Sequence, residues 1–391
     1  MSILHAQTLR LRGWAPKAGW LAWRNYDFQL TTYAILLSLF GLALAYSNSV
    51  GSTHESLTIN SPFVRTIMWA VIAAVVLGLT TIFDYKWLKS FSWPLYFINM
   101  GLLVVTLRIG SGTGEAGSAA RWIVIAGFQF LFSELAKIIM VVVFAAFLAD
   151  RQSSIKSPWT IIGILAVLVP PWILVLMQPD LGTSLVLVAT VSGLLFMSGA
   201  SLFWMGTLTA AVAAAVPFVW THMADYQQAR LLTYLNLWAD PQGVGADPKN
   251  AGYQIIQAAK AVSAGGLGGK GLTNGNVPLP VSTTDFVWGV LGEELGFIGA
   301  MVVLILFTLM IWRLLVCAWR STEPFAMFLG CGMATMIFFQ VVVNVGMVIG
   351  LVPVTGIPLP FISYGGASLV CLAAGLGTIQ STNLRREQPG W

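Results

Sequence analysis

Long apolar runs separated by short polar breaks constrain this chain more than any other feature. A run of about 20 apolar residues spans the hydrocarbon core of a membrane, and these runs lack the amphipathic spacing of helices on a soluble domain. Because 57% of the residues are hydrophobic and only 9% are charged, we expect an all-α polytopic membrane protein with about ten transmembrane helices. The expected spans are 28–47, 63–83, 91–109, 134–149, 158–177, 181–198, 201–220, 287–312, 325–350 and 362–383.

The polar stretches of the chain resemble tails and loops, not soluble domains. A soluble protein of 391 residues would have two or three domains, whereas one helical bundle accounts for this composition better. We therefore expect a single integral-membrane domain over residues 1–391. The apolar stretch 28–46 is too long for the core of a signal peptide and lacks a small-residue cleavage site, so it is expected to be a retained first span.

The basic residues sort by side of the membrane. If the tail at 1–27 is cytoplasmic, the inner segments hold most of the lysines and arginines, and the positive-inside rule then predicts that both termini are cytoplasmic. Residues 221–286 then form a long extracytoplasmic loop between spans seven and eight, and a loop of that length is more often functional than decorative. This sorting explains the net charge of +5 without a nucleic-acid partner. The inner basic residues are Arg10, Arg12, Lys17, Arg24, Lys86, Lys89, Arg151, Lys156, Arg313, Arg320, Arg385 and Arg386.

Asp285 is the first candidate for chemistry. On a helix that begins near it, Gly289, Gly292, Gly296 and Gly299 would share its face, and such a stripe lets a neighbouring helix approach closely. An ionisable residue above a packed seam indicates function, but a carboxylate at a helix start also serves as an N-terminal cap. From the residues alone, the two interpretations have equal weight.

Two glutamates follow Asp285 on the same expected helix. Glu293 and Glu294 are consecutive and point about 100° apart, so at most one of them can share the face of Asp285. Glu293, four residues after Gly289, is the better candidate for that face. For Glu294 we expect a role in helix packing or in tethering a loop.

A second group of charges lies at the start of the span near 134–149. Glu134 and Lys137 are three residues apart and can pair on one helix face, which lowers the cost of placing both charges in a membrane. Arg121 precedes them beside Trp122 at the expected outer interface. Taken singly, Arg121 is explained by snorkelling and Trp122 by the aromatic belt.

Two further motifs carry polar groups. "GGLGGKGL" at 265–272 is not a P-loop, because Ala264 and Gly271 stand where that motif needs glycine and serine or threonine; Lys270 suits either a phosphate contact or a turn. "MQPDLGTS" at 177–184 predicts that Asp180 caps a helix, while Gln178 and Asp180 could also line a cavity. The prolines and glycines of 350–368 break a helix at an outer loop, whose backbone groups then need partners from protein or water.

Several of these stretches together resemble the SEDS family (shape, elongation, division and sporulation) of bacterial peptidoglycan polymerases, the RodA/FtsW type. They are "RWI" with "SELAK", "QPDLGTS", "GYQIIQA" followed by "GGLGGKG", "TDFVWGVLGEELGFIGA" and "NVGMVIGLVPVTGIPLPFISYGGAS", in the family's order from residue 121 to 368. The wording of the last stretch is more similar to the elongation (RodA) branch than to the division (FtsW) branch. The chain departs from the family pattern at Leu131 and Phe132, where Gln-Pro is common, and at Val281, where an acidic residue is usual.

The resemblance implies an inverting glycosyltransferase that polymerises lipid II at the outer face of the bacterial cytoplasmic (inner) membrane, with a class B penicillin-binding protein as its partner. Asp285 matches the family's essential aspartate, and Arg121, Glu134, Lys137 and Lys270 match positions where the family keeps those residue types. This raises the catalytic interpretation of Asp285 far above the capping one.

A mechanism can be stated as a hypothesis on these residues. Asp285 would act as general base on the acceptor hydroxyl, and Arg121, Lys137 and Lys270 would surround the departing pyrophosphate, with Glu134 orienting Lys137. A divalent cation, Mg²⁺ or Mn²⁺, could share the pyrophosphate and take Asp285 as its ligand; no organic cofactor is expected. The rival interpretations are a lipid flippase or transporter, in which the same charges line a path, a division-branch polymerase, and a scaffold without chemistry.

Overall fold

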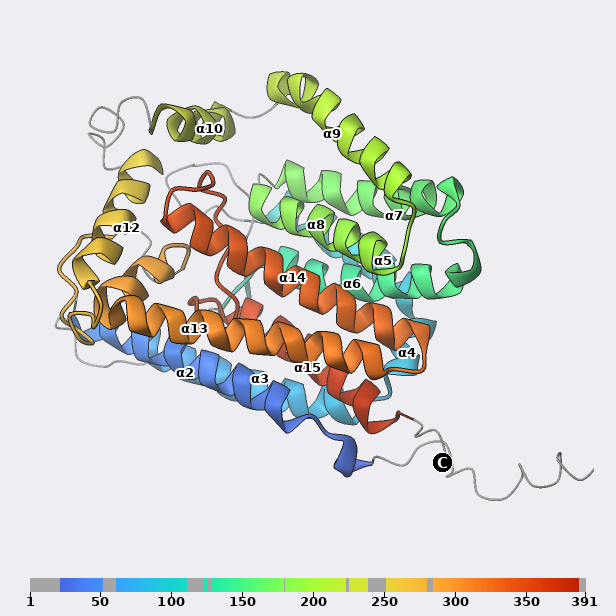
Figure 1. Cartoon of the computed structure of the whole chain (residues 1–391), viewed down its shortest axis with the longest axis horizontal. Coiled ribbons are helices and arrows are strands. Elements are labelled where there is room, and N and C mark those ends of the chain that lie inside the picture. Colours follow the sequence, from blue (N-terminus) through green and yellow to red (C-terminus); the bar gives the residue numbers. More distant parts are fainter. Residues whose placement is uncertain are drawn as a thin grey trace, which may run out of the picture.

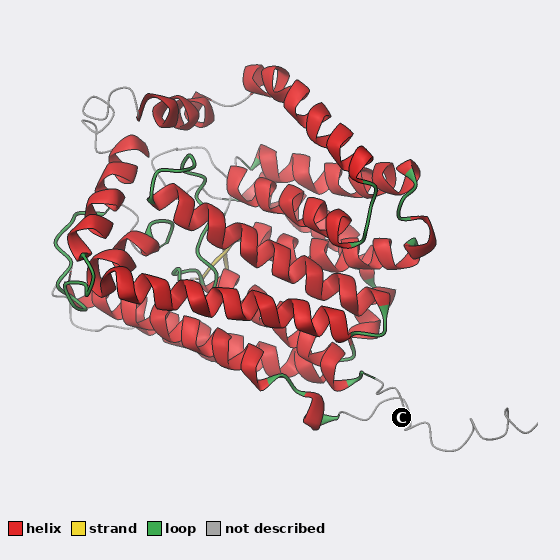
Figure 2. Cartoon of the chain, viewed as in Figure 1, coloured by secondary structure: helices red, strands yellow, loops and turns green. Residues whose placement is uncertain are grey.

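The computed structural model describes residues 22–51, 61–110, 122–125, 128–178, 180–222, 225–237, 251–279 and 284–386. Within them the chain is almost entirely helical (Figure 2). The ten longest apolar helices coincide with the ten expected spans to within a few residues at most ends. They are α2 (Phe28–Gly51), α3 (Pro62–Ile82), α5 (Ser92–Ile109), α6 (Phe132–Asp150), α7 (Pro158–Met177), α8 (Leu181–Met197), α9 (Leu202–His222), α13 (Val287–Arg320), α14 (Pro324–Val348) and α15 (Gly366–Leu384).

Shorter elements connect these helices. One small antiparallel hairpin precedes α6, with Ile123 opposite Phe130. Two helices, α10 and α12, occupy most of the described part of the expected long loop and lie at the same end of the bundle as the start of α13 (Figure 1). The short elements are η1 (Trp23–Asn25), α4 (Tyr85–Ser90), β1 (Ile123–Ile125), β2 (Phe128–Phe130), η2 (Gln152–Ser154), α10 (Asp225–Leu237) and α12 (Ala251–Gly265).

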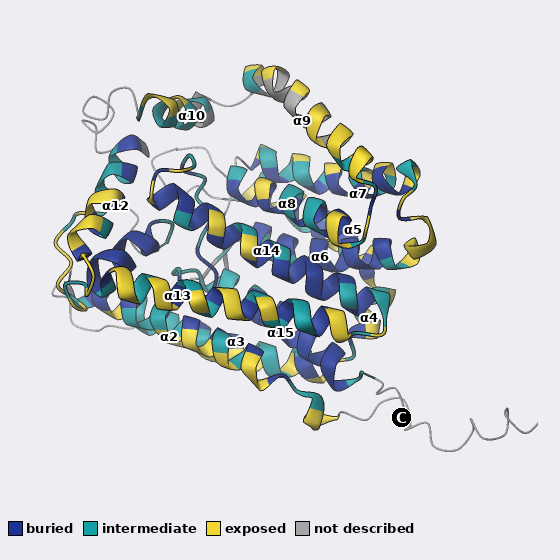
Figure 3. Ribbon diagram, in the orientation of Figure 1, coloured by how far each residue is buried: buried dark blue, intermediate teal, exposed yellow. Residues whose placement is uncertain are grey.

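The pattern of burial matches a bundle in a lipid bilayer. Seven of the helices, α2, α3, α5, α6, α7, α13 and α14, are long and apolar enough to cross a membrane, and α8 is a shorter apolar helix. The most apolar stretches of α6 and α14 are 78% and 72% buried, whereas that of α3 is only 11% buried, so α6 and α14 form the centre and α3 the periphery (Figure 3). The exposed side chains of α3 are large and apolar, as at Val71, Val75 and Leu79, which is the surface that lipid requires. The chain is therefore a multi-pass membrane protein.

Helix starts are set by local sequence. Ser61 accepts a hydrogen bond from the backbone N–H of Val64 and precedes Pro62 at the first helical position of α3, a combination that favours a helix start. Asp84 accepts from the backbone N–H of Lys86 and starts α4. These caps place the ends of the spans where the sequence changes from apolar to polar.

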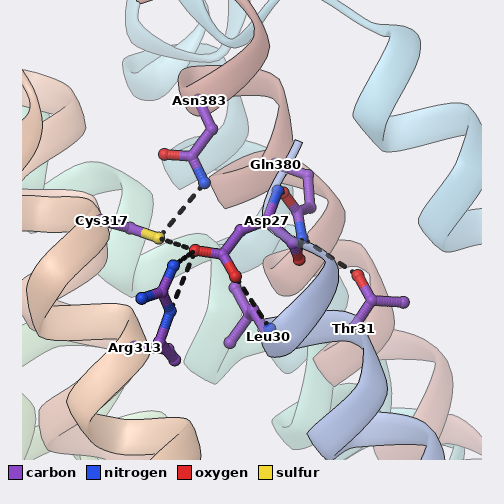
Figure 4. Close-up of polar contacts among 7 residues, drawn as sticks. All are labelled: Asp27, Leu30, Thr31, Arg313, Cys317, Gln380 and Asn383. Carbon is purple, nitrogen blue, oxygen red and sulfur yellow. Dashed lines mark hydrogen bonds and ion pairs between the residues drawn. The ribbon is translucent and has the colours of Figure 1, made fainter. Parts of the chain in front are cut away.

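A buried polar network joins the first described span to two of the last ones (Figure 4). Asp27, only 8% exposed, accepts from the guanidinium of Arg313 on α13, with Oδ2 to Nη2 at 2.5 Å and to Nε at 3.1 Å. Gln380 on α15 bonds the backbone of Asp27 from both amide atoms, at 3.0 and 2.7 Å. Cys317 adds a longer contact of 3.4 Å from its thiol to the same carboxylate. The sequence analysis did not foresee this network, because its members lie far apart in the chain.

Candidate active site

One cavity of about 270 Å³ gathers several of the predicted site residues. It is lined by the starts of α6 and α8, by α10, by the turn that leads into α13, and by the irregular segment between α14 and α15. Glu134, Lys137, Asp180 and Asp285 all line it. Other described residues in its wall include Trp122, Leu131, Thr183, Arg230, Thr284, Gly356, Ile357, Pro358, Tyr364 and Ser368.

Asp285 lies in a turn just before α13. The N-cap position of α13 belongs to Phe286, which makes no side-chain capping bond, so Asp285 is not the N-cap residue of this helix. The backbone around Asp285 is fixed from two sides: Ser363 donates its hydroxyl to the carbonyl of Thr284 at 2.6 Å, and Asn344 donates its amide to the carbonyl of Asp285 at 2.9 Å. The turn thereby holds the Asp285 carboxylate in the cavity wall.

Asn344 is the residue that links the two loops of the site. It is completely buried within α14, and its Nδ2 also donates to the carbonyl of Ile357 at 2.8 Å. One side chain thus bonds the turn that carries Asp285 and the irregular segment at 350–368, and it gives one backbone carbonyl of that segment, that of Ile357, the protein partner that it needs. The sequence analysis missed Asn344, although a lone amide inside an apolar span is a signal for such a role.

The charged pair predicted on α6 is present. Lys137 Nζ lies 2.7 Å from Glu134 Oε1, and both side chains are almost fully buried. Next to them, Ser133 donates its hydroxyl to Asp180 Oδ2 at 2.9 Å, while Asp180 Oδ1 accepts from the backbone N–H of Thr183 at 3.0 Å. Asp180 therefore caps α8, as predicted, and also ties α8 to α6 at the cavity.

Arg230 on α10 is a second cation in the cavity wall that the sequence analysis did not single out. Its Nη1 lies 3.5 Å from the carbonyl oxygen of Val354. Asp285 Oδ2 and Arg230 Nη1 lie 3.4 and 3.9 Å from the point where a Cβ on Gly356 would stand, so the two atoms are no farther apart than the sum of these distances. The sequence signal that could have pointed to Arg230 was a basic residue in the helical stretch "QQARLLTYL".

Lys270 and Glu293 do not lie where the sequence analysis placed them. Lys270 Nζ pairs with Glu293 Oε1 at 2.6 Å, and the same oxygen accepts from the backbone N–H groups of Asn276 and Val277 at 2.8 and 3.1 Å. Neither residue lines the cavity of Asp285 among the described residues. Glu293 instead anchors the end of the long loop, and Glu294, which accepts from the hydroxyl of Ser47 on α2, has the packing role that was predicted.

The expected glycine stripe is interrupted. Gly289 and Gly292 do receive a neighbouring helix, because Ala258 and Val262 of α12 would lie within 4 Å of a Cβ at these positions. At Gly296, however, φ is 66° and α13 is kinked, so the stripe does not continue along one face. A Cβ on Gly296 would stand 2.2 Å from the backbone N of Gly269, which shows that the "GGLGGKG" segment packs backbone to backbone against this kink.

Of the two remaining predicted residues, only Gln178 is described by the structure. Gln178 is buried and donates its amide to the carbonyl of Leu103 on α5 at 2.9 Å, and it is not among the described residues that line the cavity. Arg121 lies outside the residues that the structure describes.

The cavity residues offer limited ligands for a metal ion. In the described ranges no three His, Cys, Asp or Glu side chains are close enough to hold one, and Glu134 and Asp180 are already bonded within the protein. Mg²⁺, however, is commonly held by one or two carboxylates together with the phosphates of a substrate and retained waters. Asp285 is a carboxylate that suits this open type of site.

Comparison with known proteins gives one family. Residues 28–388 match the profile of the FtsW/RodA/SpoVE cell cycle proteins. The chain is 34% identical over 361 residues to stage V sporulation protein E of Bacillus subtilis, covering 90% of this chain and 95% of the relative. It is 39% identical over 302 residues to peptidoglycan glycosyltransferase MrdB of Escherichia coli, covering 75% and 78%. A probable peptidoglycan glycosyltransferase FtsW of Geobacter metallireducens is 32% identical, with 92% and 95% covered.

Solved structures agree with this assignment. A chain from a peptidoglycan synthase complex, described as coordinating polymerization and crosslinking, superposes with a TM-score of 0.74 at 29% identity and covers 92% of this chain and 97% of that chain. The rod shape determining protein RodA of Thermus thermophilus gives a TM-score of 0.67 at 25% identity, with 93% and 98% covered. The chain belongs to the FtsW/RodA/SpoVE family of cell cycle proteins.

Proposed function

We propose that this protein is a peptidoglycan glycosyltransferase that polymerises lipid II into glycan strands. The observation that carries the proposal is the position of Asp285, which faces one cavity together with the cations Lys137 and Arg230. Relatives with more than 30% identity bear the name peptidoglycan glycosyltransferase, which supports the same activity here.

The reaction needs a proton acceptor at the attacking hydroxyl. In the proposed step, the 4-hydroxyl oxygen of the acceptor sugar attacks the anomeric carbon of the donor, and the bond from that carbon to the pyrophosphate oxygen breaks. The hydroxyl proton passes to the Asp285 carboxylate, and the electron pair of the broken bond leaves with the polyprenyl pyrophosphate. Attack opposite to the leaving group inverts the anomeric centre. A positioned carboxylate base contributes typically 10²–10⁴-fold to such a step.

The leaving pyrophosphate needs fixed positive charge. Lys137 is held by Glu134 at 2.7 Å, so its position is set before substrate binds, and preorganised charge of this kind is effective in stabilising a transition state. Arg230 provides a second cation close to Asp285. Arg230 takes the place of Lys270 in the group that we assign to the pyrophosphate, because Arg230 lines the cavity and Lys270 is not among the described residues of its wall.

The dimensions of the cavity limit what it can enclose. At about 270 Å³ it is slightly below the 300–1,000 Å³ range of pockets that enclose whole ligands. We therefore assign it to the reacting sugar and pyrophosphate, with the polyprenyl chain and the growing strand outside. A divalent cation, Mg²⁺ or Mn²⁺, bound by Asp285 would add charge neutralisation at the pyrophosphate, and none of the steps above depends on it. Loss of activity in chelator, restored by either cation, would support that assignment; full activity in chelator would refute it.

We also propose in which membrane the protein acts and with which partner protein. We place the enzyme in the bacterial cytoplasmic membrane, with both termini inside and the cavity facing outward, as the positive-inside rule favours. A class B penicillin-binding protein would be its partner, in line with the similar chain found in a complex of polymerisation and crosslinking. We assign the elongation role, in which the enzyme maintains cell shape, because the stretch at 344–368 is more similar to the elongation branch of the family.

The decisive experiment measures glycan strands formed from labelled lipid II by the purified chain with its penicillin-binding partner. Asp285→Asn should lower the polymerisation rate at least about 100-fold without unfolding the protein. Asp150→Asn is the matched control, because that carboxylate is exposed and pairs with Lys89 at the other end of the bundle. Equal rates for Asp285→Asn and wild type would refute the role of Asp285. If wild type forms no polymer but moves lipid II across liposome membranes, the protein is a flippase instead.

A further inference from the structure

A polar hollow of about 200 Å³ lies at the end of the bundle opposite the Asp285 cavity. α13 begins two residues after Asp285 and ends at Arg320, immediately before Ser321 in the wall of the hollow. The 34 residues of this helix correspond to roughly 50 Å at 1.5 Å per residue. Figure 1 shows α4, the α13–α14 turn and the end of α15 together at that end. The hollow is therefore separate from the proposed active site.

The wall of the hollow carries an excess of positive charge. Lys86, Arg385 and Arg386 line it together with a single acid, Glu323. Arg385 is partly neutralised by Asp84, whose Oδ2 lies 3.5 Å from its Nε. Among the described residues, Lys86 and Arg386 form no ion pair. Counted against Asp84 and Glu323, the three cations leave one net positive charge at the hollow.

The acid in the wall is already bonded. Glu323 accepts a hydrogen bond from the hydroxyl of the buried Tyr85. Burial raises the pKa of the Tyr85 phenol, and the neighbouring carboxylate raises it further, so the phenol keeps its proton and remains a donor. Tyr85 therefore adds no negative charge, and one oxygen of Glu323 already has its donor.

The position of Arg385 is fixed by the protein. Its guanidinium donates to Ser381 Oγ at 2.6 Å and to the carbonyl of Ile82 at 2.5 Å, at the end of α3. Arg385 is therefore already ordered, so the binding of an anion would not cost conformational entropy at this side chain.

The surroundings of the hollow are those of a membrane interface. Two exposed tryptophans are close in sequence to residues of the wall. Trp87, 56% exposed, follows Lys86, and Trp319, 90% exposed, stands two residues before Ser321. Exposed tryptophans gather at the depth of lipid headgroups, and apolar side chains such as Ile82 are exposed beside them. An anion at this depth is more readily supplied by a phospholipid than by the solution.

We propose that this hollow binds the phosphate of an anionic phospholipid, with Lys86 and Arg386 as the charged contacts. Basic pockets between membrane helices recognise anionic headgroups in this way. The volume of about 200 Å³ is below the range for whole small-molecule ligands, which fits a headgroup phosphate but not a nucleotide. The acyl chains would lie along the exposed apolar side chains beside the hollow.

The test compares lipid affinities of the full-length chain purified in a neutral detergent. Phosphatidylglycerol and phosphatidylcholine are titrated separately, and the melting temperature gives the apparent affinity for each. The test variant is Lys86→Gln with Arg386→Gln. The control is Lys156→Gln with Arg320→Gln, which removes the same charge without altering the wall of the hollow. A third titration uses inorganic phosphate at matched concentration.

We expect phosphatidylglycerol to bind more tightly than phosphatidylcholine to wild type and to the control. The test variant should lose about 25-fold in affinity for phosphatidylglycerol, from two cations each contributing about fivefold. Its melting temperature in phosphatidylcholine should equal that of wild type. Equal phosphatidylglycerol affinities of the test variant and the control would overturn the proposal. Full protection by inorganic phosphate would overturn the lipid as the source of the anion. Asp285→Asn should retain the lipid affinity, because the proposal does not depend on the glycosyltransferase activity.

Discussion

Removal of Lys137 should destabilise the bundle, because it leaves Glu134 without its partner. The two side chains are 3% and 5% exposed and their charged atoms are 2.7 Å apart, so solvent screens neither of them. Removing one member of a buried ion pair costs about 3–5 kcal/mol. At about 2 °C per kcal/mol for a large domain, Lys137→Met should lower the melting temperature by about 6–10 °C. Lys156→Met, on an exposed loop at the other end of α6, is the control and should change it little.

The double variant Glu134→Gln with Lys137→Met separates stability from activity. Replacing both members of a buried pair by neutral groups of similar size is often neutral for stability, so the double variant should recover most of the lost melting temperature. It should still fail to polymerise lipid II, because the cation assigned to the pyrophosphate is gone. A single variant as stable as wild type would refute the buried pair. A double variant that regains both stability and polymerisation would refute the role of Lys137 toward the substrate.

Three further predictions concern the framework of the site. Asn344→Leu removes the donor to the partly buried carbonyl of Asp285 and to the buried carbonyl of Ile357, and loss of a buried hydrogen bond costs about 1–3 kcal/mol. We expect a lower melting temperature and a reduced polymerisation rate, and a variant with wild-type values would contradict the linking role. Gly366→Ala would place a Cβ 2.1 Å from the ring of Trp69, and overpacking of this kind costs typically 1–3 kcal/mol of stability. Thermal unfolding measures this loss, and the double variant that also carries Trp69→Leu should regain stability. Lys270→Gln breaks the pair with Glu293, so limited proteolysis should cleave the segment at 266–279 faster; an unchanged cleavage rate would show that the backbone contacts alone hold this segment.

Local patterns in the sequence were sufficient to predict the helices and one charged pair. Apolar runs specify spans because the bilayer fixes their length, and the ten expected spans correspond to ten helices. The pairing of Glu134 with Lys137 follows from the spacing of three residues on any helix. The cap at Asp180 follows from its position before an apolar run. Each of these predictions needs only the geometry of one helix.

The contacts between loops could not be predicted in the same way. Lys270 and Glu293 meet because the chain folds back over 23 residues, and no local pattern contains that reversal. The prediction that Glu293 shares the face of Asp285 assumed that both residues stand on one helix, whereas Asp285 lies in the turn before α13, which begins at Val287. Arg230 and Asn344 reach the site from α10 and α14, so only the tertiary path of the chain brings them to Asp285.

The network at Asp27 has a consequence for how the protein is made. Arg313 follows Asp27 by 286 positions, so at about 5–20 residues per second the ribosome delivers the arginine about 15–60 s after the aspartate. Gln380, at a separation of 353, arrives later still. During that interval the first described span is in the membrane without these partners, and its acid lies at the very start of the helix, where water can solvate it. A chain that stops before α13 never supplies the counter-charge, so this part of the bundle can close only when synthesis is almost complete.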